Sequence, residues 1–408
     1  MAEYVALRPQ FDRDAELWTY RDAVEHILDT FEVDRSSLRS VRMAMRSISQ
    51  VMRDLPTKSR WSVYESRMVL KTEGVFGTGC SLEYDHTGGT YERQVTLTGG
   101  TWPDNVRYYR IKIGTVDYDV AERISNTVVT LQVGSNPGAD VAAGQSFTAY
   151  RPTHFLPSDF RRMISLTDLA SKIEPSYVEA IDINRQQIYQ SSNSVPTMYT
   201  IHNMRDTYGN AMLELGPYPM SSRSYSVVYE RSPRLLLVEG YAKGLVTTSG
   251  TTVTGSGGAS FEDAHVGAII RFSKDATQEP TGTFGYADGS YNPFFAQRVI
   301  MQKNSSTQVV LDAALPSNVT GVRYVISDPL DVMNQSMVTY VLRAAELEMA
   351  RMSQRKDKQE FMMFERQALE EAMAADLLWR ELGMPVTWYP FHLQPWTTVP
   401  AEVVGGKQ

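Results

Sequence analysis

A β-rich module occurs twice in this chain, and the duplication limits the architectures that the chain can adopt. Each copy passes through short β-rich runs, glycine turns and a Ser/Thr-rich turn before a final aromatic strand. The first copy contains Thr96–Gly99, Trp102, Ile111–Ile113, Arg123–Leu131 and Phe147–Tyr150, and the second contains Thr252–Gly255, Phe261, Ile269–Phe272, Lys303–Leu311 and Tyr324–Ile326. A unit repeated within one chain is typical of a structural building block more than of a catalytic domain.

Helical patterns flank both copies. In residues 17–31 and again in 38–55, apolar side chains recur at alternating spacings of three and four, which places them on one helix face. Pro56 is expected to end the second of these helices. A third helical pattern covers residues 331–382, with a solvated, kinked junction at 355–358.

The sequence therefore predicts an α+β fold. It is a helical bundle, made of an N-terminal hairpin and a long C-terminal helix, with two inserted small β-sandwich or barrel-like modules and an extended C-terminal arm. The two modules are interpreted as decoration on a helical frame that closes without them. The expected boundaries are 1–71 for the hairpin and a strand, 72–152 for the first β-module, 153–245 for a mixed middle region of the frame, 246–330 for the second β-module, 331–383 for the long helix or helix pair, and 384–408 for the arm.

Within the middle region the patterns differ from one segment to the next. Helical or mixed structure is expected to resume at Leu156–Met163, where Ser158 or Asp159 could cap a helix. Thr197–His202 and Ser224–Tyr229 alternate like strands.

The two N-terminal helices carry opposite charge. Residues 12–32 hold seven acidic and two basic side chains, whereas residues 35–60 hold seven basic and one acidic. Four arginines of the second helix lie on one stripe beside the apolar seam: Arg39, Arg42, Arg46 and Arg53. This stripe either pairs with the acidic helix, here or in a neighbouring subunit, or faces DNA or another acidic partner.

The C-terminal segment combines prolines with aromatic residues. Four prolines between residues 385 and 400 forbid a regular helix. A disordered tail is usually poor in aromatic residues, yet this one contains Trp388, Tyr389, Phe391 and Trp396. The combination favours an extended arm whose aromatic side chains dock on a neighbouring protein, although an arm folded back on its own core has the same composition.

The sequence contains no pattern of residues typical of a catalytic, metal or cofactor site. The six histidines are scattered, and a single cysteine, Cys80, excludes a multi-cysteine zinc site. Asp85 and His86 follow Cys80 closely, but a small buried thiol is the favoured interpretation. A net charge of −7 argues against general affinity for nucleic acid. No signal peptide or membrane-spanning helix is expected.

The organisation of the chain resembles the head–tail adaptor proteins of tailed bacteriophages and the related tail tubular protein of short-tailed phages. The resemblance is carried by the hairpin Tyr20–Leu55 with Arg60-Trp61-Ser62 after it, by Phe155–Phe160, and by the long helix Met333–Leu382 ahead of the proline–aromatic arm. Leu97–Pro103 and Asn136–Val141 look like parts of the small β-domains that decorate such adaptors.

The resemblance implies a structural virion protein without enzymatic activity. Copies would form a ring, commonly of twelve, at the neck of a virion assembled in the host cytoplasm. Its partners would be the portal protein, reached by the arm with Trp388, Tyr389, Phe391 and Trp396, a downstream tail or nozzle protein, and double-stranded DNA passing through the lumen.

Two alternatives remain open. The first is another tail component, a fibre or glycan-binding protein, that uses aromatic residues of the β-modules for adhesion: Trp102, Phe284, Tyr286 and Tyr291. The second is a tail-associated lysin whose active-site residues are dispersed along the sequence.

Overall fold

The structure is a computed structural model, and it describes residues 18–183, 195–202, 211–280, 294–332 and 335–381. The chain divides into two compact units, each of which is described by itself. Unit 1 combines Met1–Glu65 with Ser232–Gln408, and unit 2 is Ser66–Arg231.

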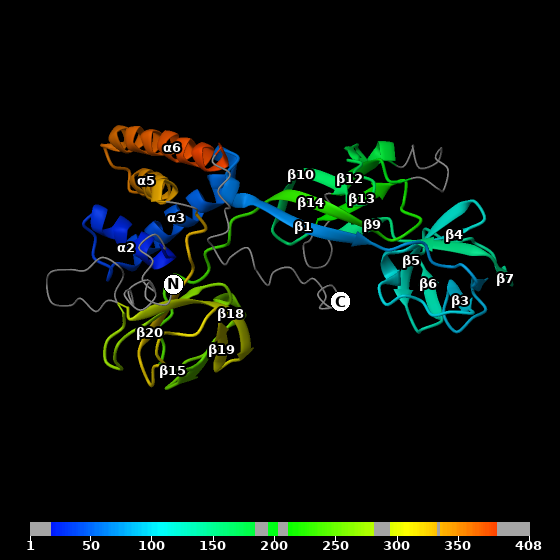
Figure 1. Cartoon of the computed structure of the whole chain (residues 1–408), viewed down its shortest axis with the longest axis horizontal. Coiled ribbons are helices and arrows are strands. Elements are labelled where there is room, and N and C mark those ends of the chain that lie inside the picture. Colours follow the sequence, from blue (N-terminus) through cyan, green and yellow to red (C-terminus); the bar gives the residue numbers. More distant parts are fainter. Residues whose placement is uncertain (1–17, 184–194, 203–210, 281–293, 333–334, 382–408) are drawn as a thin grey trace. The chain divides into compact units, whose positions relative to one another are not determined.

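The described residues are mostly β structure, so the prediction of a helical bundle carrying two insertions is wrong (Figure 1). They form sheets of three, four, six and seven strands. Four α-helices are delimited within the described residues, all in unit 1: α2 (Tyr20–Thr30), α3 (Leu38–Lys58), α5 (Gln335–Met352) and α6 (Lys358–Glu381). Short 3-10 turns, η2 (Ser62–Tyr64), η3 (Val106–Tyr108) and η4 (Asp263–His265), link other elements.

The predicted N-terminal helices are present as α2 and α3. Their 3-4 spaced side chains form the core of the helical layer, with Ile27, Ile48 and Leu55 fully buried. α3 continues to Lys58, so Pro56 lies within the last turn of the helix and does not end it.

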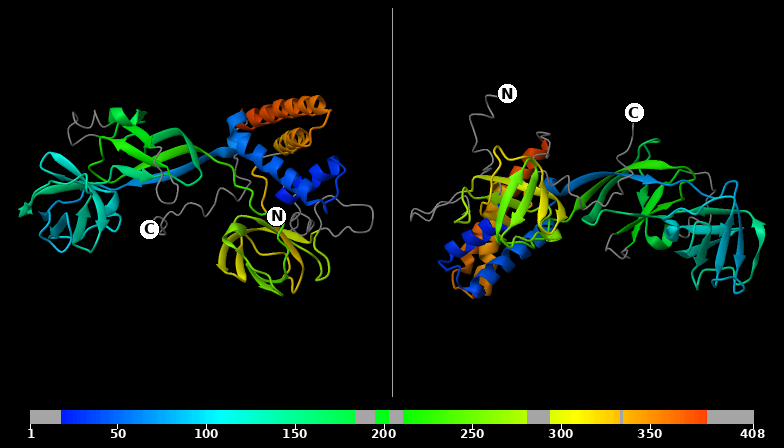
Figure 2. Two further views of the ribbon diagram at one scale, coloured as in Figure 1. Left: turned by 180° about the vertical axis from the view of Figure 1, so that it is seen from behind. Right: turned by 90° about the horizontal axis from the view of Figure 1, so that it is seen from below.

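The segment predicted as a long C-terminal helix or helix pair contains two helices, α5 and α6. The chain reverses between Met352 and Lys358, where Gln354 adopts a left-handed φ of 55°. α5 and α6 consequently lie side by side (Figures 1 and 2). α5 is buried on most of its surface because α2, α3 and α6 all pack against it.

A strand begins at Phe160, within the segment Leu156–Met163 for which the sequence suggested helical or mixed structure. Strand β10 (Phe160–Asp168) pairs antiparallel with β14 (Arg223–Arg231), and β1 (Glu65–Thr72) lies on the other side of β14. The register of β10 shifts twice, between Phe160 and Arg162 and between Met163 and Ser165. Each bulge adds a residue, which breaks the alternation of a strand and leaves a spacing that imitates a helix.

A second sheet of this region contains β9 (Thr153–Phe155), β11 (Ser176–Tyr177), β12 (Met198–His202) and β13 (Met212–Gly216) in the order β11-β12-β13-β9. Leucines and tyrosines from both sheets, such as Leu213 and Tyr225, form one core. The predicted strands at 197–202 and 224–229 are confirmed as β12 and β14.

The two predicted β-modules have the same strand order. The first module is a near-barrel of seven strands in the order β7-β2-β3-β6-β5-β4-β8. Its strands are β2 (Ser81–Asp85), β3 (Gln94–Thr98), β4 (Arg110–Ile113), β5 (Val116–Arg123), β6 (Val128–Leu131), β7 (Val141–Gln145) and β8 (Phe147–Tyr150). The second module is a half-barrel of six strands in the order β15-β16-β19-β18-β17-β20. Its strands are β15 (Leu245–Ser249), β16 (Thr252–Ser256), β17 (Ile269–Phe272), β18 (Ala296–Ser305), β19 (Gln308–Leu311) and β20 (Tyr324–Ser327). Without β7 the two orders are identical.

Hydrogen bonds outside the strands repeat as well. The backbone N–H of Trp102 donates to the carbonyl of Asn126, and the N–H of Phe261 donates to that of Ser306. Both aromatic side chains are 1% exposed and lie in their module's core. A surface ion pair also recurs, joining Arg123 to Asp104 at 3.2 Å in the first module and Lys303 to Asp263 at 2.9 Å in the second.

The pairing corrects one alignment of the two copies. Val128 of the first module and Gln308 of the second are equivalent residues. Thr96 lies opposite Val128, and Thr254 lies opposite Gln308, so Thr96 and Thr254 are equivalent. Thr96–Gly100 therefore corresponds to Thr254–Gly258, two residues later than the match of Thr96–Gly99 with Thr252–Gly255. Both segments end in two glycines, and the equivalent Gly99 and Gly257 both have a positive φ, of 89° and 63°.

The second β-module is part of unit 1's core structure and not a decoration. Its last strand continues into a bridge between Thr19 and Pro329, and the N–H of Tyr20 donates to the carbonyl of Asp328 at 2.7 Å. The Arg271 side chain of β17 reaches Asp22 of α2 at 2.7 Å. The start of α2 is therefore held by contacts with the module.

Candidate interaction surfaces

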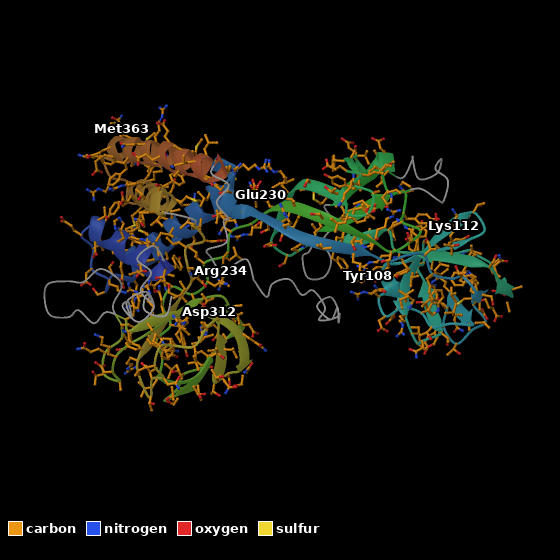
Figure 3. The ribbon with its side chains drawn as sticks, in the orientation of Figure 1. Tyr108, Lys112, Glu230, Arg234, Asp312 and Met363 are labelled. Atoms are coloured by element: carbon orange, nitrogen blue, oxygen red, sulfur yellow. The ribbon has the colours of Figure 1, made fainter. Side chains whose placement is uncertain are left out.

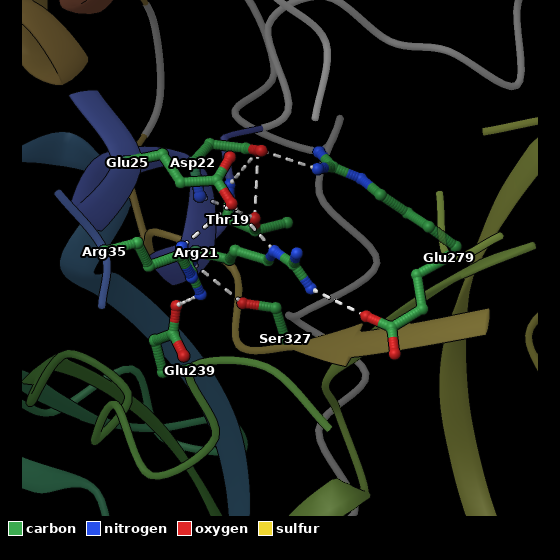
Figure 4. A network of polar contacts seen from close by, with 9 residues as sticks. Thr19, Arg21, Asp22, Glu25, Arg35, Glu239, Glu279 and Ser327 are labelled. Atoms are coloured by element: carbon green, nitrogen blue, oxygen red, sulfur yellow. Dashed lines mark hydrogen bonds and ion pairs between the residues drawn. The ribbon is translucent and has the colours of Figure 1, made fainter. Parts of the chain in front are cut away.

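Buried charged side chains are the first places to look for chemistry, and in unit 1 they have structural partners. Asp22 caps α2 through Thr19 and is bound by Arg271 (Figure 4). Asp328 accepts from Arg234 and from two backbone N–H groups. Glu346 of α5 is fully buried between His26 and Arg343. These carboxylates fix elements to one another and leave no reactive group facing solvent.

The network at the start of α2 extends to the surface. Arg21 binds Glu25, which also accepts from Arg35, and Arg35 in turn binds Glu239 (Figure 4). Burial by itself raises the pKa of Asp22, but the nearby Arg271 guanidinium and the hydrogen bonds from Arg271 and Thr19 outweigh burial and lower this pKa below its usual value.

The thiol–imidazole arrangement at Cys80 is not formed. The half-buried Cys80 thiol donates a long hydrogen bond to the carbonyl of Gly99, while His86 Nδ1 is bound to the hydroxyl of Tyr84. In the described part of the chain, His, Cys, Asp and Glu side chains nowhere gather in a group of three or more that could hold a metal ion. The same residues include no helix long and apolar enough to cross a membrane.

The arginine face of α3 consists of Arg39, Arg42, Arg46 and Arg53. All four side chains are exposed, and none forms an ion pair with any other residue that the structure describes. The acidic α2 therefore does not neutralise these four arginines. Its Glu25 instead forms an ion pair with Arg35, which precedes α3. Four unpaired cations along about 21 Å of one helix make a surface suited to an anionic partner.

The outer face of α6 is a second exposed surface. α6 buries Ala368, Ala372 and Asp376, and the opposite half faces outward. Figure 3 shows Met363 on this outward side. Its large apolar side chains are Met362, Met363, Phe364, Met373, Leu377 and Leu378, between 41% and 71% exposed. Glu370 and Glu371 lie among them and are exposed too.

Several predicted site residues lie outside the described residues. These are the arm residues Trp388, Tyr389, Phe391 and Trp396, together with Phe284, Tyr286 and Tyr291 of the proposed adhesive surface. Trp102, the remaining adhesive candidate, is buried against Phe76 and Phe147 and its indole N–H donates to the carbonyl of Thr127. It is therefore a core residue that cannot contact a glycan.

One buried group in unit 2 was not singled out from the sequence. His154 of β9 is 2% exposed, and its Nε2 makes no hydrogen bond within the described structure. Burial, with a smaller effect of Arg151, lowers the pKa of His154 to about 3, so the imidazole is neutral at physiological pH.

Comparison with known proteins adds no assignment: no family model matches the sequence, and no curated protein or solved structure is similar enough to count as a match.

Proposed function

We propose that this chain is a structural virion protein, a head–tail adaptor whose copies form a ring between the portal and the tail of a phage particle. The observation that carries the proposal is the exposed apolar face of α6. Large apolar patches on a folded protein usually mark a binding surface, and here six large side chains gather on one helix. The identification as an adaptor comes from the resemblance of the chain's organisation to that family.

Charge and polar chemistry agree with an assembly role. Asp22, Asp328 and Glu346 are occupied in holding elements together. The chain is acidic overall, with a net charge of −7, which suits a ring that guides DNA through its lumen without gripping it. In this proposal the ring contacts the portal protein on one side and a tail or nozzle protein on the other, at the neck of the virion, after assembly in the host cytoplasm.

The test mixes the purified full chain with the portal protein encoded in the same genome and images the product by negative-stain electron microscopy. We expect ring-shaped particles with the chain on one face of the portal. Full-length protein that leaves the portal bare at micromolar concentration contradicts the proposed function.

A truncated chain that lacks residues 384–408 tests the arm separately. We expect it to keep the circular dichroism spectrum of the described fold and to lose portal binding, because Trp388, Tyr389, Phe391 and Trp396 are the proposed anchors. Portal binding at full affinity by the truncated chain would contradict the arm assignment alone.

A further inference from the structure

Unit 1 carries two exposed surfaces of opposite character on two different helices. The arginine face of α3 is basic, with Asp54 as the only acidic side chain on that helix. α6 holds six acidic and three basic side chains, and its outer half combines Glu370 and Glu371 with the apolar face. The two helices have comparable lengths, about 31 Å for α3 and about 36 Å for α6.

We propose that the arginine face of α3 in one copy of this chain docks on the outer face of α6 in a second copy. The contact rests on the ring proposed above and names the surfaces that build it. Long arginine stems can cover methionine and leucine side chains while their guanidinium groups reach carboxylates. One contact of this kind therefore covers an apolar surface and an unpaired basic surface together.

The arrangement within one copy favours a contact between copies. α5 packs against both α3 and α6, and the faces in question are the sides of those helices that α5 leaves exposed. Leu38, at the first turn of α3, is 70% exposed and adds an apolar side chain at one end of the arginine face.

The contact is heterologous, because each copy uses a different face for each of its two neighbours. Every added copy leaves one arginine face and one α6 face open at the ends, and the series closes as a ring where the rotation between neighbouring copies allows it, as the proposed ring requires. DNA as the partner of the arginine face would leave the apolar face of α6 uncovered, which is why a second copy is the favoured occupant.

Disulfide trapping tests the pairing in the full-length chain with Cys80→Ser. Arg46→Cys and Glu370→Cys are prepared as separate proteins and oxidised alone, mixed, and mixed on the portal. We expect a disulfide-linked dimer in the mixtures and none with either protein alone. Arg67→Cys, an exposed position of β1, replaces Arg46→Cys in the control mixture and gives no dimer with Glu370→Cys.

Charge reversal gives an independent test by sedimentation and mass photometry. Arg42→Glu with Arg46→Glu is expected to reduce self-association at least tenfold, and adding Glu370→Arg and Glu371→Arg in the same chain is expected to restore it. The matched control, Arg67→Glu with Lys71→Glu, changes the net charge equally at exposed positions of β1 and keeps wild-type assembly.

The outcomes separate this inference from the proposed function. Absence of the mixed disulfide, both in solution and on the portal, overturns the inference even if portal rings form. Wild-type assembly by the Arg42→Glu, Arg46→Glu variant with loss of binding to a double-stranded DNA fragment also overturns it and assigns the face to DNA. If the mixed disulfide forms but the chain does not bind the portal protein, the result supports the inference and contradicts the proposed function.

Discussion

The Nη1 atom of Arg271 lies 2.7 Å from Oδ1 of Asp22, so a strand of the second β-module and the first turn of α2 share one buried ion pair. Arg271 is 4% exposed and Asp22 2%. The same carboxylate completes the capping box with Thr19, accepting from its N–H at 3.0 Å and from its hydroxyl at 2.9 Å. Removing either charged partner therefore affects the helix start and the module together.

Arg271→Met should destabilise unit 1 strongly. Breaking a buried pair by removing one partner typically costs about 3–5 kcal/mol, since the other charge stays buried. Lys303→Met is the matched control, because Lys303 binds the 92% exposed Asp263 and exposed pairs contribute little. Urea unfolding measures both, and equal midpoints for the two variants would contradict a stabilising role for the buried pair.

Unit 1 should lose stability in acid through Asp22. Because the pKa of Asp22 is lowered on folding, the unfolded chain takes up the proton first. The stability that Asp22 contributes is complete above its pKa in the unfolded chain, about 4, and is lost as the pH falls toward its lower pKa in the folded protein. Urea midpoints of wild type between pH 7 and 3 should fall at the acid end, and Arg271→Met should show a flatter profile. A steeper acid loss in Arg271→Met would rule out this origin.

His154→Leu should make unit 2 less sensitive to pH. The pKa of His154 is lowered from 6.5 to about 3, so its contribution is complete above pH 6.5 and declines as pH falls toward 3. One proton corresponds to a slope of about 1.4 kcal/mol per pH unit. Hydrogen exchange of the β9 and β13 amides at pH 7 and 5 measures the change. Unit 1 amides serve as the internal control, and an unchanged pH response in the variant would contradict the prediction.

Trp102→Ala and Phe261→Ala should have parallel effects in different units. Each removes a fully buried aromatic from the same position of a β-module, which typically costs about 3–5 kcal/mol. Hydrogen exchange should show faster opening of unit 2 for the first variant and of unit 1 for the second. If either variant increases the hydrogen-exchange rate in both units, the prediction that the two modules have independent cores is wrong.

Local periodicity predicted those parts of the fold that depend on neighbouring residues. The helices α2 and α3 were predicted because Ile27, Ile48 and Leu55 lie on single 3-4 spaced faces. The repeat was predicted because its order of runs is preserved, but its register was not. Thr-x-Thr-Gly occurs at Thr252–Gly255 as well as at Thr96–Gly99, and only the strand opposite, through Gln308 and Val128, decides which residues correspond.

Contacts between distant segments explain what the sequence did not reveal. The bulges of β10 disguise a strand, and the reversal at Gln354 carries neither glycine nor proline. Asp22 and Arg271 are 249 positions apart, and nothing local marks them as partners. The arginine face was visible as a pattern, while the exposure of Phe364 and Leu378 on α6 depends on which half of that helix α5 covers.

The two β-modules differ most at one equivalent connection. In the first, β4 and β5 are joined by Gly114 and Thr115 alone, whereas residues 273–295 join β17 and β18 in the second. Strand order survives this difference, so the connection accommodates inserted sequence without a change of scaffold. An epitope or fluorescent reporter grafted between Gly114 and Thr115 would therefore be displayed at a site whose tolerance the chain's own second copy demonstrates.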